Sequence, residues 1–299
     1  MILYGFSGEA PNFGDELNHW LFPQLLPDFF DDDPGKLFLG IGSVLFDHHP
    51  AQPLKIVLGS GFGGYTAAPK LDDRWEIHAV RGPRTAAMLG LDPALGIGDS
   101  AVLLRALSLR RASVTRGPIF IPHFTSATYG AWEAVAAEAG LRYVDPRRPV
   151  KEVFGEILAA SVVVSEAMHG VIVADAMRVP WVAMRPLFQN NVAKWADWGD
   201  ALGVDVVFRP MPASSPMEVA LITMQHHREI SRALRWHGRG LNGAGSSLMR
   251  GRAARSLRRA ASEPPQLSGD VPLDRSFERM QEALRRVQRL HAPAELAVL

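Results

Sequence analysis

Short apolar runs alternate along most of the chain with longer segments in which apolar residues recur at helical spacing, and this alternation constrains the fold most strongly. Each run is bounded by glycine or proline. Strands that alternate with helices in this way form parallel sheets with crossover connections. In the first part of the chain we expect strands at 1–6, 36–41, 55–58 and 75–80, and helices at 14–25 and 83–89.

The same alternation resumes at Pro118, after a basic stretch at 107–117 that is rich in small residues and has little apolar period. This stretch is the best candidate for a linker between two units. The sequence therefore predicts an α/β protein with two doubly wound units. Beyond the linker we expect strands at 119–122, 142–144, 161–164 and 181–184, and helices at 131–139, 150–160, 170–177 and 192–198.

The C-terminal region has a different composition. Nine arginines stand against one acid, Glu229, between Arg228 and Arg259, and the glycine- and serine-rich run "GRGLNGAGSS" within this stretch predicts a flexible loop. Apolar positions at helical spacing predict a last helix over 273–290 that docks on a core. We expect a first Rossmann-like domain at 1–112, a second at 113–240, and a tail at 241–299 made of a basic loop and a helix.

Composition excludes several classes of function. The chain has no cysteine, which rules out disulfides, thiolate nucleophiles and cysteine-ligated metals. A net charge of +1 gives no electrostatic argument for a nucleic-acid partner. With no signal sequence and no apolar run of roughly 18 to 20 residues, we expect a soluble cytoplasmic protein. Its basic tail is either a solvated face or a peripheral contact with anionic lipid at the inner face of the membrane.

Polar residues follow several expected strands of the first unit, at the carboxyl ends where open α/β sheets bind ligands. After the first strand, Asn12, Asp15 and Glu16 either face a ligand or cap the following helix. Gly61, in the loop "GSGFGG", either lets the backbone approach a ligand or makes a tight turn, and it lacks the spacing of a dinucleotide fingerprint. Asp99 is a base, a hydroxyl ligand or a cap.

Two arginines follow another strand of the first unit, in the segment "RGPRT". Arg84 would stand in the first turn of a helix that begins at Pro83, where its charge opposes the helix dipole, and Arg81 would lie just before it. Because guanidinium groups bind carboxylates and phosphates in bidentate fashion, we expect these arginines to bind an anion.

A second group of candidates gathers at the strand ends of the second unit, namely His123, Ser165, Glu166, His169 and Arg185. His169 would begin a helix, with Glu166 beside it at i, i+3, and such a pair suits acid–base chemistry. The alternative is a neutral histidine satisfied within the core.

Taken in order, these segments resemble the polysaccharide pyruvyltransferase family, and more closely the ketal pyruvyltransferases of exopolysaccharide assembly. The resemblance implies a GT-B-like fold, phosphoenolpyruvate as donor, a sugar diol on a lipid-linked oligosaccharide as acceptor, and no metal or organic cofactor. The matching residues are Asn12, Gly14, Asp15, Glu16, Arg81, Arg84, Thr85, Gly98, Asp99, Ser165, His169 and Gly170.

The resemblance also implies roles for the candidate residues. His169 is the expected general acid and Asp15 the expected base, with Glu16 and Glu166 as substitutes. Many members carry an arginine where this chain has Ala167, so we expect Arg185 to replace it. The expected donor-binding residues are Arg81, Arg84, Arg185, Lys194, His123 and Ser165, and the expected acceptor-binding residues are Asn12, Glu16, Asp99 and Gly61.

Two other functions remain open from the sequence. One is a GT-B glycosyltransferase that uses a nucleotide sugar, which would share the fold but need a pocket for base and ribose. The other is a non-catalytic subunit of a polysaccharide-assembly complex, which the basic tail would serve.

Overall fold

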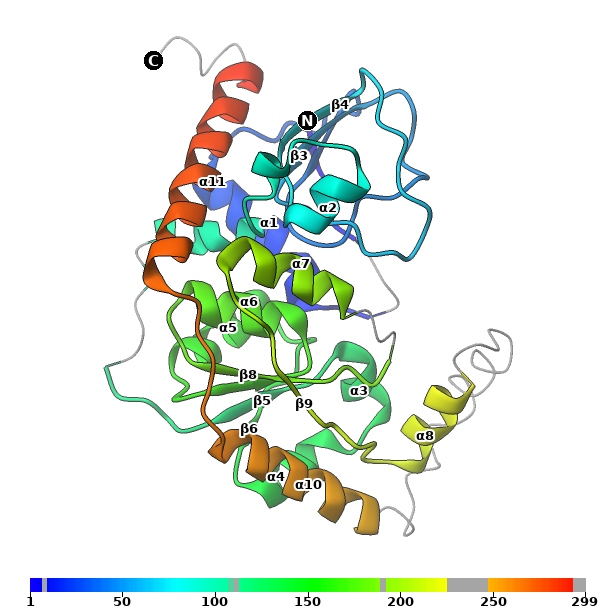
Figure 1. The fold of residues 1–299 in the computed structure, drawn as a ribbon, viewed down its shortest axis with the longest axis vertical. Coiled ribbons are helices and arrows are strands. Elements are labelled where there is room, and N and C mark those ends of the chain that lie inside the picture. Colours follow the sequence, from blue (N-terminus) through cyan, green and yellow to red (C-terminus); the bar gives the residue numbers. More distant parts are fainter. Residues whose placement is uncertain (7–9, 108, 110–112, 189–191, 225–246, 293–299) are drawn as a thin grey trace.

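A computed structural model describes residues 1–6, 10–107, 109, 113–188, 192–224 and 247–292. It contains two sheets in which every pairing between strands is parallel. The α/β, GT-B-like fold class expected from the sequence is confirmed by these two sheets and the helices around them (Figure 1). The first sheet has the order β1 (Ile2–Leu3), β2 (Lys36–Leu39), β3 (Leu54–Leu58), β4 (Trp75–Ala79).

Alternate residues of the first sheet pack on opposite faces, as the two-residue period of a strand requires. Phe38 and Ile56 join the cluster that contains α1 (Phe13–Leu25), η2 (Ser100–Ala106) and α11 (Asp270–His291). Leu39 and Val57 lie in the cluster that contains Ala86 of α2 (Pro83–Met88). A short 3₁₀ turn, η1 (Pro93–Leu95), packs beside α2.

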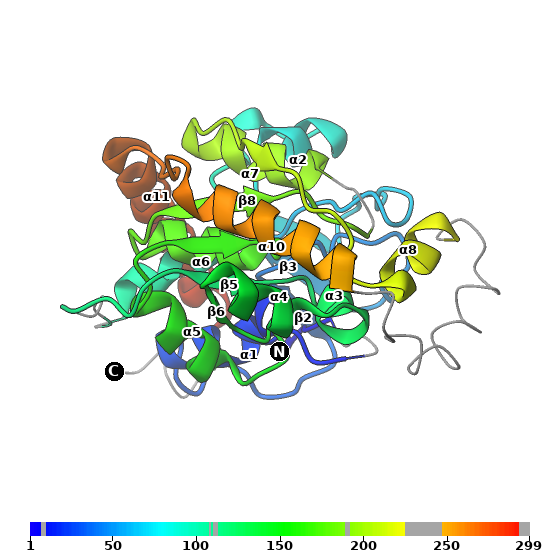
Figure 2. The same cartoon turned by 90° about the horizontal axis from the view of Figure 1, so that it is seen from below.

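The second sheet has the order β6-β5-β7-β8-β9, so strand order reverses between β5 and β7. Helices α5 and α6 cover one face, and helices α4 and α10 cover the other. Figure 2 shows α10 lying across α4. The strands are β5 (Ile119–Ile121), β6 (Arg142–Tyr143), β7 (Val163–Ser165), β8 (Trp181–Met184) and β9 (Phe208–Arg209). The helices are α3 (Phe124–Tyr129), α4 (Trp132–Ala139), α5 (Val150–Leu158), α6 (Met168–Ala176), α7 (Ala193–Leu202), α8 (Pro216–Thr223) and α10 (Ser247–Ser262).

One continuous apolar cluster joins the two halves of the molecule. It includes Phe13 and Leu21 of α1, Val171 of α6, Trp198 of α7 and Leu284 of α11. Trp20 of α1 also lies against Phe154 of α5, with ring centroids 5.5 Å apart. The helices between the sheets therefore form a shared layer, visible in Figure 1, from which polar residues of both halves face one another.

The C-terminal region divides between the two halves. Helix α10 packs on α4 of the second half, whereas α11 returns to β3, β4 and η2 of the first. The expected last helix is confirmed as part of α11, and the basic stretch beyond Ser247 is helical where no helix was expected. Most of the predicted flexible loop lies outside the described residues. The division at 112 and 240 stays a prediction. None of the described helices is long and apolar enough to cross a bilayer.

Candidate active site

The carboxyl ends of β5 and β7 mark the place where strand order reverses in the second sheet. Open α/β sheets bind ligands in the crevice outside such a point. His123 follows β5, and the segment from Glu166 to His169 follows β7. The sheet thus brings these residues of the second half together at the layer shared with the first half.

His169 lies in the first turn of α6, directly against the first half of the molecule. A Cβ atom at Gly14 would lie only 2.4 Å from His169 Nδ1, so glycine is needed at the start of α1 for the imidazole to fit. Its Nε2 atom lies 3.7 Å from Asp99 Oδ2, and its side chain is 15% exposed. The expectation that His169 begins a helix at the edge of the second sheet is confirmed.

Asp99 serves both as a helix cap and as the partner of His169. Its Oδ1 accepts a hydrogen bond from Ala101 N (3.0 Å) and caps η2, while its Oδ2 faces the imidazole. Asp99 Oδ2 and His169 Nε2 are buried and have no hydrogen-bond partner among the described residues. The carboxylate is therefore placed to orient the imidazole and to balance its charge when it is protonated. We expected Asp99 to bind the acceptor sugar. The structure differs, because Asp99 is buried against His169.

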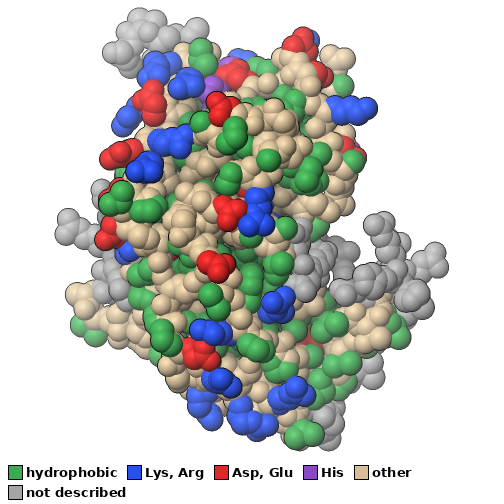
Figure 3. Space-filling view, viewed as in Figure 1, with side chains coloured by type: hydrophobic (Ala, Val, Ile, Leu, Met, Phe, Trp, Pro, Cys, Tyr) green, Lys and Arg blue, Asp and Glu red, His purple; other side chains and the backbone are tan. Residues whose placement is uncertain are grey.

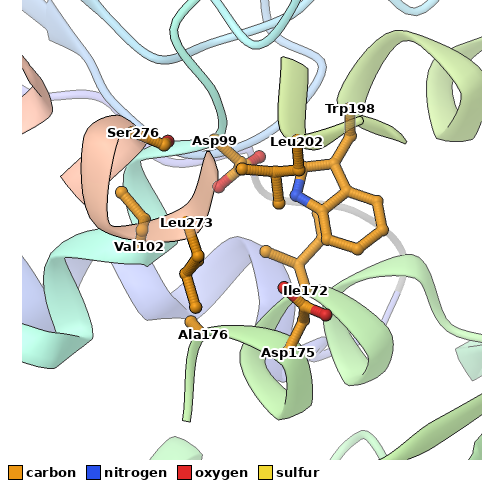
Figure 4. Close-up of a pocket in the computed structure, with 9 residues that line it drawn as sticks. All are labelled: Asp99, Val102, Ile172, Asp175, Ala176, Trp198, Leu202, Leu273 and Ser276. Carbon is orange, nitrogen blue, oxygen red and sulfur yellow. The ribbon is translucent and has the colours of Figure 1, made fainter. Parts of the chain in front are cut away.

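A small cavity lies beside Asp99, among residues of η2, α6, α7 and α11. Its volume is about 10 Å³, which is on the order of the room needed for one water molecule. Figure 4 shows the Asp99 carboxylate among Trp198, Leu202 and Ile172. The cavity is too small for a substrate.

Asp15 lies in the first turn of α1, next to His169. Asn12 Nδ2 donates a hydrogen bond to Asp15 Oδ2 (2.9 Å), and Asn12 Oδ1 accepts from Gly14 N as the cap of the helix. Burial raises the pKa of Asp15, and the charges of His169 and Lys194 and the Asn12 bond partly oppose that rise. A carboxyl group in this setting suits proton transfer. The Glu16 side chain is half-buried and has no hydrogen bond to the described residues.

Lys194 and His123 supply a cation and a neutral donor near Asp15. Lys194 Nζ donates to the hydroxyl of Tyr65 (3.0 Å), and its charge acts on both Asp15 and His123. Burial, with a smaller contribution from Lys194, lowers the pKa of His123 to about 3. His123 Nδ1 accepts from Thr125 N (3.3 Å), so the neutral ring carries its proton on Nε2. Lys194 thus lies close enough to both Asp15 and His123 for its charge to act on each of them.

Glu166 and Ser165 hold the loops of the second sheet together. The buried Glu166 carboxylate accepts hydrogen bonds from His123 N (2.8 Å), Ser126 Oγ (3.0 Å) and Leu187 N (2.9 Å). Burial raises the pKa of this carboxyl group. Ser165 Oγ is fully buried and donates to backbone carbonyls. The pairing of Glu166 with His169 that we expected is not found, because the Glu166 oxygens are turned toward other donors.

Arg81 is buried between the two halves, with 1% of its surface exposed. Its guanidinium donates to Asp197 Oδ2 of α7 (3.2 Å), Ser43 Oγ (2.7 Å) and Phe62 O (2.9 Å). A Cβ atom at Gly61 would lie 2.1 Å from Arg81 Cζ, so Gly61 makes room for this guanidinium. We expected both residues to contact a ligand. Arg81 and Gly61 instead belong to the contact between the two halves of the molecule.

The rest of the "RGPRT" segment also binds α7. Asp197 accepts from Thr85 N (3.0 Å) and Thr85 Oγ1 (2.6 Å), and Arg84 Nε donates to Asp200 Oδ2 (2.6 Å) on the surface. The anions that these two arginines bind are thus carboxylates of the chain itself, Asp197 and Asp200. Since α7 carries Lys194, the segment positions a cation at the site. Asp197 was not among the residues predicted from the sequence. Its place between Trp195 and Trp198 on a buried helix face could have indicated that its carboxylate pairs with a buried cation or donor.

Arg185, expected to bind the donor, lies with its guanidinium 5.6 Å from the ring centroid of Phe208 and lines a hollow between β9 and α10. Among the described residues, one group of histidine and acidic side chains lies close enough to share a metal ion: Glu76, His78 and His291. Glu76 Oε1 lies 2.5 Å from His78 Nε2 and 3.1 Å from His291 Nε2, which ties α11 to β4. This group is separate from His169.

Comparison with known proteins decides the family. The model of the family described as polysaccharide pyruvyl transferase matches residues 12–186, more than half of the chain. The chain belongs to this family. The match covers Asn12, Asp15, Asp99 and His169, whereas Lys194 and the C-terminal region lie beyond it.

A curated relative supports the same assignment. The succinoglycan biosynthesis protein ExoV of Rhizobium meliloti (strain 1021) is 41% identical over 225 residues, which is 73% of this chain and 70% of ExoV. The protein is therefore a polysaccharide pyruvyl transferase enzyme. Among solved structures, the wall teichoic acid polymerase TagF (H548A) aligns over 96% of this chain and 89% of its own, with 8% identity and a TM-score of 0.36.

Proposed function

We propose that this pyruvyl transferase uses phosphoenolpyruvate as donor and a sugar diol of a lipid-linked oligosaccharide as acceptor, and forms a cyclic pyruvate ketal in exopolysaccharide assembly. The observation that carries the proposal is the contact of His169 with Asp99 beside Asp15. An enol phosphate needs an acid to protonate its methylene carbon, and a diol needs a base to accept its protons. Both kinds of group meet at this position.

The first step is protonation of the donor. His169 transfers a proton from Nδ1 to the methylene carbon of phosphoenolpyruvate, whose double-bond pair forms the new C–H bond. The adjacent carbon becomes an oxocarbenium-like electrophile. Asp99, at Nε2, stabilises the imidazolium before transfer and fixes the direction of the ring. Nδ1 is the proposed donor atom because Nε2 is buried facing Asp99.

Two additions complete the ketal. The first sugar hydroxyl attacks the electrophilic carbon and gives its proton to Asp15. The bond between that carbon and the phosphate oxygen then breaks, and phosphate leaves with the electron pair and one proton. The second hydroxyl attacks the same carbon, and its proton restores His169. The proton of the first hydroxyl, held by Asp15, leaves with phosphate. The proton of the second hydroxyl replaces the one that His169 gave to carbon, so the protons balance.

The donor's phosphate and carboxylate need cations and hydrogen-bond donors. Lys194 and the Nε2–H group of His123 are the proposed ligands, because Lys194 acts on both Asp15 and His123. Glu16, which has no partner for its carboxylate among the described side chains, is the proposed contact to the acceptor. We place this reaction at the cytoplasmic face of the membrane, where a lipid-linked acceptor would be presented.

Release of inorganic phosphate from phosphoenolpyruvate tests the proposal. The purified chain is assayed with and without lipid-linked oligosaccharide, beside His169→Gln and the control His48→Gln, whose side chain is 65% exposed. We expect release that requires acceptor, a loss of about a hundredfold or more in His169→Gln, and no change in His48→Gln. Absence of release with any acceptor, together with stabilisation by a nucleoside diphosphate, would replace the proposal with nucleotide-sugar transfer.

A further inference from the structure

A basic groove lies between β9 and α10, outside the His169 site. Five arginines line it and define what we call the arginine groove: Arg185, Arg209, Arg252, Arg255 and Arg259. Its volume is about 840 Å³. Figure 3 shows Lys and Arg side chains gathered over the end of the molecule formed by α10.

The arginine groove carries an excess of positive charge. One carboxylate, Glu263, also lines it, and that group already pairs with Arg209 (2.8 Å) and Arg259 (3.2 Å). Arg252 and Arg255 have no carboxylate partner within 4.0 Å in the part of the chain that the structure describes. Uncompensated guanidinium groups around one hollow repel each other, and a bound anion would relieve that repulsion.

The geometry of α10 separates these arginines from others on the same helix. Arg252, Arg255 and Arg259 are spaced i, i+3, i+7 and so share one face. Arg258 points instead to α4, where its guanidinium donates to Glu138 O. The helix is anchored by buried apolar residues on a third side, Ala253, Ala254, Leu257 and Ala260. The three groove arginines are therefore displayed by a fixed support.

The arginine groove is connected with the active site through the end of β8. Arg185 follows β8 directly, and its backbone N donates to Arg209 O (2.9 Å), at the groove. Two residues further, Leu187 N donates to Glu166, which also holds the backbone of His123. The segment after β8 therefore links the groove to the loop that holds His123.

We propose that the arginine groove binds the phosphate-bearing headgroup of a lipid. The idea rests on the proposed function, in which the acceptor sugar is joined to a lipid. Guanidinium groups bind phosphate oxygens in bidentate fashion, and the groove is large enough for more than one phosphate. The phosphate belongs either to the diphosphate linkage of the acceptor or to a surrounding anionic phospholipid, and the experiment separates these sources.

The test uses the full chain and compares charge changes on two sides of one helix. The double variant Arg252→Gln/Arg255→Gln is compared with Arg258→Gln and with the unaltered chain in binding to phosphatidylcholine vesicles with and without phosphatidylglycerol. Two arginines near an anionic surface contribute on the order of a tenfold to thirtyfold change in affinity. We expect that loss in the double variant and a loss of less than about twofold in Arg258→Gln.

Competition identifies the source of the phosphate. Displacement of the chain from vesicles by inorganic pyrophosphate supports recognition of a diphosphate, and binding that responds to phosphatidylglycerol alone supports the phospholipid. If the double variant and the unaltered chain bind equally, both to these vesicles and to pyrophosphate alone, the proposal is overturned, as it is by an equal loss in Arg258→Gln. The vesicle assay needs no catalysis, so its outcome is independent of phosphate release, which tests the proposed function.

Discussion

Asp99 Oδ2 and His169 Nε2 face each other at 3.7 Å across the boundary between the two halves of the molecule, and neither atom has a hydrogen-bond partner among the described residues. Asp99 caps η2, whose first residue, Ser100, donates a hydrogen bond to Leu58 O of β3 in the first sheet, and His169 lies in α6, which packs on the second sheet. The proposed acid is thus complete only when both halves are packed together.

Asp99→Asn separates the charge of this carboxylate from its role as a cap. Asparagine caps helices about as well as aspartate, so we expect a stability close to that of the unaltered chain. The imidazolium loses its counter-charge, and kcat for phosphate release should fall by roughly a hundredfold to ten-thousandfold. Steady-state kinetics and thermal unfolding measure the two effects. A kcat within twofold of the original would show that Asp99 only caps η2.

Gly14→Ala tests the close contact between α1 and His169. The new Cβ would lie 2.4 Å from Nδ1, so the imidazole must move and phosphate release should fall at least tenfold. Gly155→Ala in α5 is the control, because its Cβ meets nothing within 4 Å. That change should raise stability by about 0.5–1 kcal/mol and leave the rate unchanged. Equal rates in the two variants would contradict this placement of His169.

Much of the scaffold could be predicted because local pattern determines it. Short apolar runs bounded by glycine or proline became strands, and the carboxyl-end rule placed His123 and His169 near each other at the edge of the second sheet. The cap at Asn12 follows from its position before a helix. These inferences need only near neighbours in sequence and one topological rule.

The partners of charged groups could not be predicted in the same way. Arg81 and Asp197 are 116 residues apart, and nothing in either segment says that the helices carrying them pack together. Glu166 was expected beside His169 from helical spacing, but the chain enters α6 only at Met168, so that spacing does not apply. Helix α10 was not predicted because its apolar face is small and lies among arginines in the sequence. That face consists of Ala253, Ala254, Leu257 and Ala260.

The junction between α2 and α7 predicts two very different effects of removing an aspartate. Asp197→Ala leaves the buried Arg81 without its counter-ion and Thr85 without its acceptor, which should cost about 3–5 kcal/mol of unfolding free energy. Asp200→Ala removes an ion pair whose arginine is 55% exposed, and the expected cost is below about 1 kcal/mol. Chemical denaturation compares the two. Similar costs would mean that Arg81 is solvated.

Glu218 should give the chain a pH-dependent stability that is unrelated to catalysis. Burial raises its pKa to about 7, although Ser214 N, Ser214 Oγ and Trp132 Nε1 donate to its carboxylate. The folded state then holds a proton that the unfolded state releases above the ordinary glutamate pKa of 4.5. Unfolding free energy attributable to this group therefore falls as pH rises from about 4.5 through 7, by roughly 3 kcal/mol in all.

Glu218→Gln cannot ionise and should remove this part of the pH dependence. The amide nitrogen cannot accept from Trp132 or Ser214, so the variant should start from a lower stability below pH 4.5. Its stability relative to the unaltered chain should then increase as the pH rises from 4.5 past 7. Glu152→Gln is the control, because that carboxylate is 51% exposed and pairs with Arg148 on the surface. Denaturation curves at a series of pH values measure the difference. If the difference between Glu218→Gln and the unaltered chain does not change with pH, Glu218 is ionised in the folded state at its ordinary pKa and its surroundings are more polar than the burial indicates.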